Sequence, residues 1–166
     1  DSGWVGMGPR CEEFEKLFAE YVGAKYAVSV SSCTAALHLA LLAANVGPGD
    51  EVITTTLTFV ATTNAIEYAG AKPVLVDIDP RTLNIDPNLI EAAITKRTKA
   101  IIPVHYGGLP CEMDKIFAIA KKHNLIIVED AAHAAASCWK GKMIGGLKNS
   151  LACFSFYPNK NMTSVE

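Results

Sequence analysis

The feature of this sequence that most constrains its fold is a regular alternation between short apolar runs and segments with helical spacing. From residue 26 to residue 130, runs rich in valine and isoleucine are separated by longer segments in which apolar residues recur with the period of a helix. That alternation is typical of βαβ units, whose helices cover both faces of a parallel sheet. The sequence therefore predicts an α/β fold with three layers, in which a mostly parallel central sheet lies between two layers of helices.

The expected elements can be placed by residue number. Strands are expected at 26–30, 51–55, 72–78, 100–105, 125–130 and 150–157, and helices at 9–22, 33–47, 59–70, 86–94 and 113–123. A glycine-turned hairpin is expected at 138–146. Because neither a linker nor a repeat interrupts the pattern, we expect residues 1–166 to belong to one domain.

Composition and charge exclude several classes of partner. Half of the 166 residues are apolar and the formal net charge is −2, so the chain lacks the basic excess of nucleic-acid-binding proteins. Its apolar runs are far shorter than the ~20 residues that a membrane span needs, and no signal-peptide pattern opens the sequence. We therefore expect a cytoplasmic protein with neither nucleic acid nor a membrane as its partner.

The cysteines are odd in number, scattered, and never spaced as C-x-x-C. This spacing favours free thiols, most of them small buried side chains, over disulfides or zinc ligands. No metal site is expected.

Three segments at the expected strand ends could carry chemistry. The first, VSSCTAALHLAL, places Cys33 and Thr34 in the first turn of a helix that follows a strand. Free N–H groups and the helix dipole favour an anion such as phosphate at that position. A serine that only caps the helix would also explain the segment.

The second segment, LIIVEDAAH, places Glu129 and Asp130 at the end of a strand that should be buried on both faces. A buried carboxylate is costly unless it is paired, so Asp130 requires a cation, a hydrogen-bond donor or a helix end to cap. If a helical turn began at Asp130, His133 would lie on the same face of that turn as Asp130. His105, at the end of another expected strand, is assigned a role in ordering a loop.

The third segment, FSFYPNKNMT, carries Lys160 just beyond the last expected strand. A lysine becomes a nucleophile when its surroundings favour the neutral amine, although most lysines are simply solvated. An anion site, a carboxylate and an amine at the strand ends of one sheet are the groups that pyridoxal 5'-phosphate (PLP) requires. They bind its phosphate, its ring nitrogen and its aldehyde, respectively.

Six blocks follow one another along the chain: GWVGMGP, SSCTAALHLAL, TFVATTNAIEYAGAKPVLVDID, VHYGGLPCEMD, VEDAAHA and FSFYPNKNMTSVE. In this order they resemble the PLP domain of the DegT/StrS family of nucleotide-sugar aminotransferases, within the fold type I aspartate aminotransferase superfamily. The resemblance implies that residues 1–166 are a PLP-binding large domain, incomplete on its C-terminal side and without the family's small C-terminal domain.

The resemblance also implies roles for individual residues. Lys160 matches the lysine that binds the cofactor covalently and then moves the proton during catalysis. Asp130 matches the carboxylate that bonds the ring nitrogen, and His133 stands where the family has glutamine or histidine beside the phenolic oxygen. Phe59 matches the aromatic residue that stacks on the ring.

Three further residues match family positions that hold the phosphate. Cys33 and Thr34 match a pair that is more commonly Gly-Thr, and Ser155 matches a serine that adds a hydroxyl. The backbone N–H at Cys33 survives the loss of glycine provided that the turn does not require a positive φ. A reactive thiol at Cys33 is the less favoured alternative, because a bound phosphate would oppose the thiolate.

The implied reaction is a ping-pong transfer of an amino group, with glutamate as the expected donor and a keto-sugar nucleotide as acceptor, in polysaccharide or lipopolysaccharide biosynthesis. Relatives act as homodimers that share their active sites. Two alternatives stay open. The chain could be a non-catalytic PLP-binding or dimerisation fragment, or a sugar dehydratase of the same family, although known dehydratases carry histidine in place of the lysine at 160.

Overall fold

A computed structural model describes residues 6–163 of the chain. Its central sheet contains β1 (Glu51–Thr55), β2 (Lys72–Val76), β3 (Thr98–Ile102), β4 (Ile126–Asp130) and β7 (Ser150–Cys153). The strands are parallel and lie in the order β2-β1-β3-β4-β7, so that their carboxyl ends meet at one edge. The mostly parallel sheet that the sequence predicts is confirmed. Trp4, in the first of the six blocks, lies outside the described residues.

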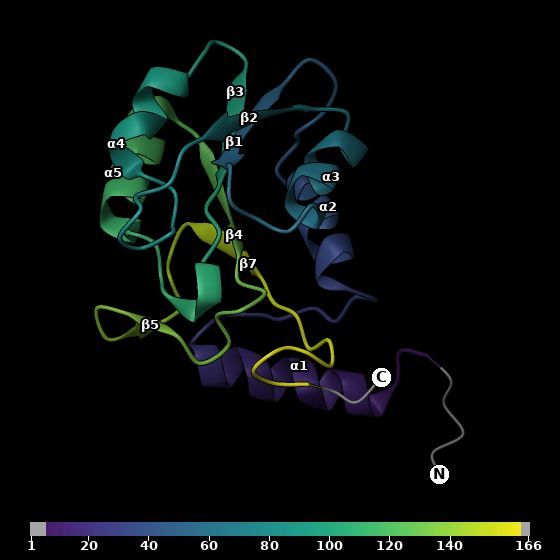
Figure 1. Cartoon of the computed structure of the whole chain (residues 1–166). Coiled ribbons are helices and arrows are strands. Elements are labelled where there is room, and N and C mark those ends of the chain that lie inside the picture. The colour runs from purple at the N-terminus through teal and green to yellow at the C-terminus, as the bar shows by residue number, and fades with distance from the viewer. Residues whose placement is uncertain (1–5, 164–166) are drawn as a thin grey trace.

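Helices cover both faces of the sheet, which confirms the three-layer arrangement (Figure 1). Helices α2 (Cys33–Ala43) and α3 (Ala61–Tyr68) lie on one face, and α4 (Pro87–Ile90) and α5 (Met113–His123) lie on the other. Helix α1 (Pro9–Val22) crosses one end of the layers. No helix between residues 6 and 163 combines the length and the apolar character that a membrane span requires.

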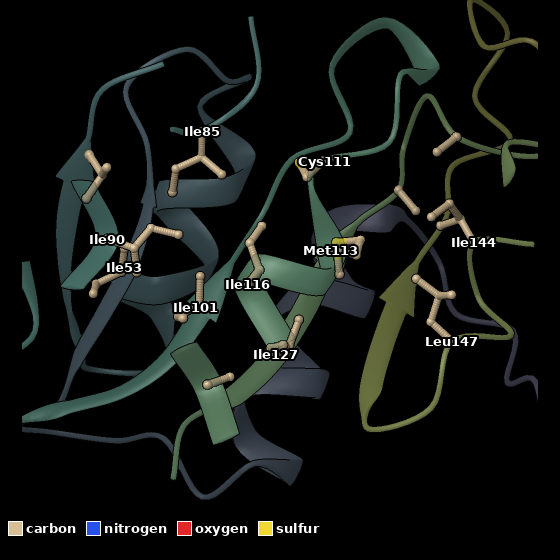
Figure 2. Packing of buried hydrophobic residues seen from close by; sticks show 14 residues of the cluster. Ile53, Ile85, Ile90, Ile101, Cys111, Met113, Ile116, Ile127, Ile144 and Leu147 are labelled. Atoms are coloured by element: carbon tan, nitrogen blue, oxygen red, sulfur yellow. The ribbon is translucent and has the colours of Figure 1, made fainter. Parts of the chain in front are cut away.

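Two hydrophobic cores hold the layers together, one on each face of the sheet. On the α5 side, Ile53, Ile101 and Ile127 of the sheet pack with Ile116 of α5 (Figure 2). The other core contains Leu37, Leu41, Val52, Ala65, Ile66, Ala100, Ile102 and Val128. Neighbouring strand residues enter opposite cores because side chains alternate along a strand. Burial on both faces is the reason that these strands are continuous apolar runs.

Helix α1 is anchored by aromatic rings from the segment that follows β7. The ring of Phe18 meets those of Phe154 and Phe156 edge to face, with centroids 5.0 Å and 5.5 Å away. The end of α1 also approaches Gly146 so closely that a Cβ there would lie 2.1 Å from the carbonyl oxygen of Val22. The aromatic contacts fix the path of the chain from β7 toward Lys160, and the Gly146 contact fixes the segment that precedes β7.

Several expected elements differ from the structure. The helix expected at 33–47 ends at Ala43, and the strand expected at 100–105 spans Thr98–Ile102. Residues 26–30 form no strand, because no strand within residues 6–163 pairs with them, and Tyr26 and Val28 are 74% and 77% exposed. The strand expected at 150–157 ends at Cys153, because the chain turns away there to place its phenylalanines on α1. The helix expected at 86–94 divides into α4 and a 3-10 turn, Glu91–Ala93.

The short hairpin is present as expected, formed by β5 (Cys138–Trp139) and β6 (Lys142–Met143). All five cysteines are free. Cys111 and Cys153 are buried, Cys11 and Cys33 are half-buried, and Cys138 is exposed on the hairpin, so the expectation that most of the cysteines are buried is wrong.

Candidate active site

The carboxyl edge of the sheet brings several of the expected site residues together. Asp130 ends β4, and the chain that leaves β7 carries Ser155 and Lys160. The start of α2 lies beside the end of β7, where the Cys33 thiol donates to the carbonyl oxygen of Cys153 over 3.5 Å. The site is therefore assembled from segments that are far apart in the sequence.

Asp130 is a buried carboxylate, only 6% exposed, that is held by two neutral donors. Its Oδ2 accepts a hydrogen bond of 2.7 Å from the hydroxyl of Thr62, which is fully buried in α3. Its Oδ1 accepts a hydrogen bond of 3.2 Å from the backbone N–H of Ala132. Among residues 6–163 no cation forms an ion pair with Asp130, so its negative charge lacks a positive partner. A buried site of this kind favours a cationic ligand group.

Lys160 lies next to His133, with 3.1 Å between its Nζ and the Nε2 of the imidazole. Partial burial lowers the pKa of His133, and the positive charge of Lys160 lowers it further, against the opposing effect of Asp130. The imidazole is therefore neutral at pH 7 and can accept a hydrogen bond from the amine. The segment between Asp130 and His133 forms turns rather than the helical turn considered from sequence.

The turn that carries Lys160 is tied back to the loop after β4. The backbone N–H of Lys160 donates to the carbonyl oxygen of Tyr157, which closes the turn. The side-chain amide of Asn161 donates to the carbonyl oxygen of Ala135 over 2.7 Å. These bonds hold the lysine on the same side of the sheet as the end of β4.

The first turn of α2 provides an anion site. Ser32 caps the helix, since its hydroxyl accepts a hydrogen bond from the N–H of Ala35, which confirms the capping role for that serine. The N–H groups of Cys33 and Thr34 have no acceptor in the described part of the chain, and the helix dipole is positive at this end. Cys33 does not adopt a positive φ. A cysteine at this position, where relatives more commonly have glycine, therefore still allows the backbone N–H to bind an anion.

Cys33 carries a neutral thiol. Burial raises its pKa well above the usual range, and the negative charge of Asp130 raises it further, while Lys160 offsets only part of the effect. The positive end of the helix dipole does not offset this increase in the pKa of Cys33. The structure therefore disfavours a reactive thiolate at this position.

Three expected residues border the site without direct contacts to Asp130 or Lys160. Phe59 precedes α3 and is 76% exposed. Ser155 is buried, and its hydroxyl accepts a hydrogen bond from the N–H of Tyr157 at 3.4 Å. Thr34 follows Cys33 in α2. The ligand contacts expected of these three residues stay predictions.

Two features of the site were missed from the sequence. One is Thr62, which donates a hydrogen bond to Asp130. The signal for it was that a buried carboxylate requires a hydrogen-bond donor. The other is a buried pair between Glu129 and His105, with 2.8 Å between Oε2 and Nε2. His105 also accepts a hydrogen bond at Nδ1 from the N–H of Cys111. It thus orders the loop after β3, as predicted, and leaves Asp130 as the carboxylate available to a ligand.

No cluster of three or more histidine, cysteine, aspartate or glutamate side chains suited to a metal ion is found among the described residues. The arrangement offers instead a carboxylate without a cation, an amine beside a neutral imidazole, and a helix terminus with free N–H groups. Those groups can hold a ligand that carries a cationic ring, a carbonyl and an anionic group.

Comparisons with known proteins identify the family to which this chain is similar. The sequence model of the DegT/DnrJ/EryC1/StrS aminotransferase family matches residues 1–166. The spore coat polysaccharide biosynthesis protein SpsC of Bacillus subtilis is 56% identical over 166 residues, which are all of this chain and 42% of SpsC. GDP-perosamine synthase of Caulobacter vibrioides is 50% identical over 167 residues, which cover 100% of this chain and 45% of that enzyme.

A solved structure of Spr1654 from Streptococcus pneumoniae, in its PLP form, superposes with a TM-score of 0.92 at 39% identity. The superposition covers 98% of this chain and 45% of Spr1654. The chain thus spans less than half the length of these relatives.

Proposed function

The chain belongs to the DegT/DnrJ/EryC1/StrS aminotransferase family, and from this premise we propose that it is the cofactor-binding part of a PLP-dependent aminotransferase. One observation carries the proposal. The buried carboxylate of Asp130 has no cation among residues 6–163, and it lies at the same sheet edge as Lys160 and the free N–H groups of α2. The PLP form of Spr1654 supports the choice of cofactor.

The residues present fit this cofactor. The N–H groups of Cys33 and Thr34, with the hydroxyl of Ser155, would hold the phosphate. Asp130 would bond the protonated ring nitrogen, and the exposed ring of Phe59 would stack on the pyridine. When bound, PLP withdraws electrons from the carbon that carries the transferred amino group. The ion pair with Asp130 would favour that withdrawal by keeping the ring positively charged.

Lys160 would bind the cofactor covalently and then act as the general base. Both tasks require the neutral amine, since a protonated amine neither attacks a carbonyl nor accepts a proton. His133 would orient the amine, because its neutral imidazole lies 3.1 Å from Nζ and can accept a hydrogen bond from it. This role needs no proton transfer by His133.

The proposed acceptor is a keto-sugar nucleotide and the proposed donor is glutamate. The names of SpsC and GDP-perosamine synthase support a sugar substrate in polysaccharide biosynthesis. Lys160 favours amino transfer over dehydration, for which the family uses histidine at that position. We further propose that residues 1–166 belong to the PLP-binding large domain of a cytoplasmic homodimer with shared active sites. The share of each relative that the chain covers is in line with one part of such a protein.

The test is a two-step assay on the whole protein. PLP-loaded protein is mixed with L-glutamate, and 2-oxoglutarate is measured. A panel of 3- and 4-keto-sugar nucleotides is then added and amination is detected by mass spectrometry. Lys160→Ala should abolish both steps, whereas Lys148→Ala, an exposed lysine just before β7, should retain them. Loaded wild-type protein that aminates no member of the panel would refute the proposed reaction.

A further inference from the structure

A row of two hydroxyls leads to the carboxylate of Asp130. Thr58 and Thr62 are 2.7 Å apart between their Oγ1 atoms, and Thr62 lies 2.7 Å from Oδ2 of Asp130. Thr62 is fully buried in α3, whereas Thr58 is half-buried in the loop before that helix. The row therefore connects a buried charge to the edge of the protein through two side chains of one segment.

The direction of the hydrogen bonds in this row is fixed by chemistry. An ionised carboxylate can only accept, so the single hydroxyl proton of Thr62 must point to Asp130. The Oγ1 of Thr62 is then free to accept, and Thr58 must be the donor between the two threonines. Successive hydroxyls that donate in one direction polarise one another, which strengthens the final bond to the carboxylate.

We propose that Thr62 is a positioning residue that fixes the rotation of the Asp130 carboxylate for its contact with the cofactor's ring nitrogen. The inference rests on the proposed function. Thr62 holds Oδ2 while the N–H of Ala132 holds Oδ1, so the carboxylate cannot turn without losing a hydrogen bond. Each oxygen keeps a second lone pair for the ring N–H. A carboxylate held in this orientation can accept the ring N–H, and this hydrogen bond keeps the proton on the ring.

A packing role alone does not explain a threonine at this position. Valine has nearly the same shape and would fill the same buried space without a polar atom to satisfy. The hydroxyl is stabilising here because it meets a charge, and bonds to charged groups are stronger than those between neutral groups. The neighbouring Thr63 provides a contrast, because its hydroxyl donates to the backbone carbonyl of Val60 and does not contact Asp130.

The test uses PLP labelled with ¹⁵N at the ring nitrogen, bound to the whole protein. The ¹⁵N chemical shift reports whether the ring is protonated, which a purely structural role of Thr62 would not alter. Thr62→Val should move the shift toward the unprotonated value and weaken PLP binding about tenfold or more, as expected for loss of a bond to a charged group. Thr62→Ser keeps the hydroxyl and should restore the wild-type shift.

Two further variants keep the test decisive. Thr63→Val removes a hydroxyl from the same helix and should leave the shift and the affinity unchanged. Thr58→Ala removes only the outer member of the row, so it tests the inference even if Thr62→Val does not fold, and it should move the shift in the same direction by less. A wild-type ¹⁵N shift in Thr62→Val, or in Thr58→Ala when the first variant does not fold, would overturn the inference. Wild-type protein that binds no PLP would instead refute the proposed function, and this inference with it.

Discussion

Replacing Asn161 by alanine should slow the covalent capture of PLP by Lys160 without removing any group that contacts the cofactor. The side-chain amide of Asn161 donates to the carbonyl oxygen of Ala135 over 2.7 Å and ties the lysine turn to the loop after β4. A neutral hydrogen bond contributes about 0.5–1.5 kcal/mol. With 1.4 kcal/mol for each factor of ten, capture should slow by about two- to tenfold if that free energy keeps the amine in place.

The assay mixes apo-protein with PLP, quenches samples with borohydride at successive times, and measures the modified Lys160 peptide by mass spectrometry. Asn159→Ala is the matched control, because this residue is on the other side of Lys160, is exposed, and makes no side-chain hydrogen bond within residues 6–163. Asn159→Ala should capture PLP at the wild-type rate. Equal rates for Asn161→Ala and the control would refute the view that the Ala135 bond positions the lysine.

Three other outcomes are expected. The pKa of His133 is lowered in the folded state, so the unfolded chain takes up this proton first as the pH falls below about 6.5. His133→Gln should therefore lose less stability than wild type between pH 7 and pH 5, measured by urea unfolding. Gly146→Ala would place a Cβ against the carbonyl oxygen of Val22 and should cost about 1–3 kcal/mol of unfolding free energy. Iodoacetamide at pH 8 should modify the exposed Cys138 well before Cys33, whose pKa is raised by burial.

Each of these outcomes has a control or a contradicting result. Gly47→Ala has open space around its Cβ and should leave the stability nearly unchanged. If His133→Gln lost more unfolding free energy than wild type between pH 7 and pH 5, the pKa of His133 would be raised in the folded protein, which would contradict this prediction. Peptide mapping that found Cys33 alkylated first would contradict the assignment of a neutral thiol.

The sequence predicts the layers of the fold because burial on both faces leaves a continuous apolar pattern in each inner strand. This apolar pattern does not predict which segments pair as strands or where an outer strand ends. Residues 26–30 have strand-like composition, yet a strand needs a hydrogen-bonded neighbour, which local sequence does not specify. The early end of β7 likewise depends on a tertiary contact, the packing of Phe154 and Phe156 on α1.

The candidate site was partly predictable for a similar reason. Asp130 and Lys160 are recognisable because a charged residue at the end of a buried strand, or in a matched motif, is unusual. Thr62 was not recognised, because a threonine inside a helix is ordinary until the fold brings it to the carboxylate. The lowered pKa of His133 could not be predicted from the sequence either, since it depends on burial and on the position of Lys160 in the fold.

The most direct test of the central claim is to locate the covalent bond between protein and cofactor. Whole protein loaded with PLP is reduced with borohydride, digested, and mapped by mass spectrometry. We expect the pyridoxyl group on Lys160, and no protein-bound pyridoxyl group in Lys160→Ala. A pyridoxyl group on another lysine, or a link that persists in Lys160→Ala, would contradict the assignment.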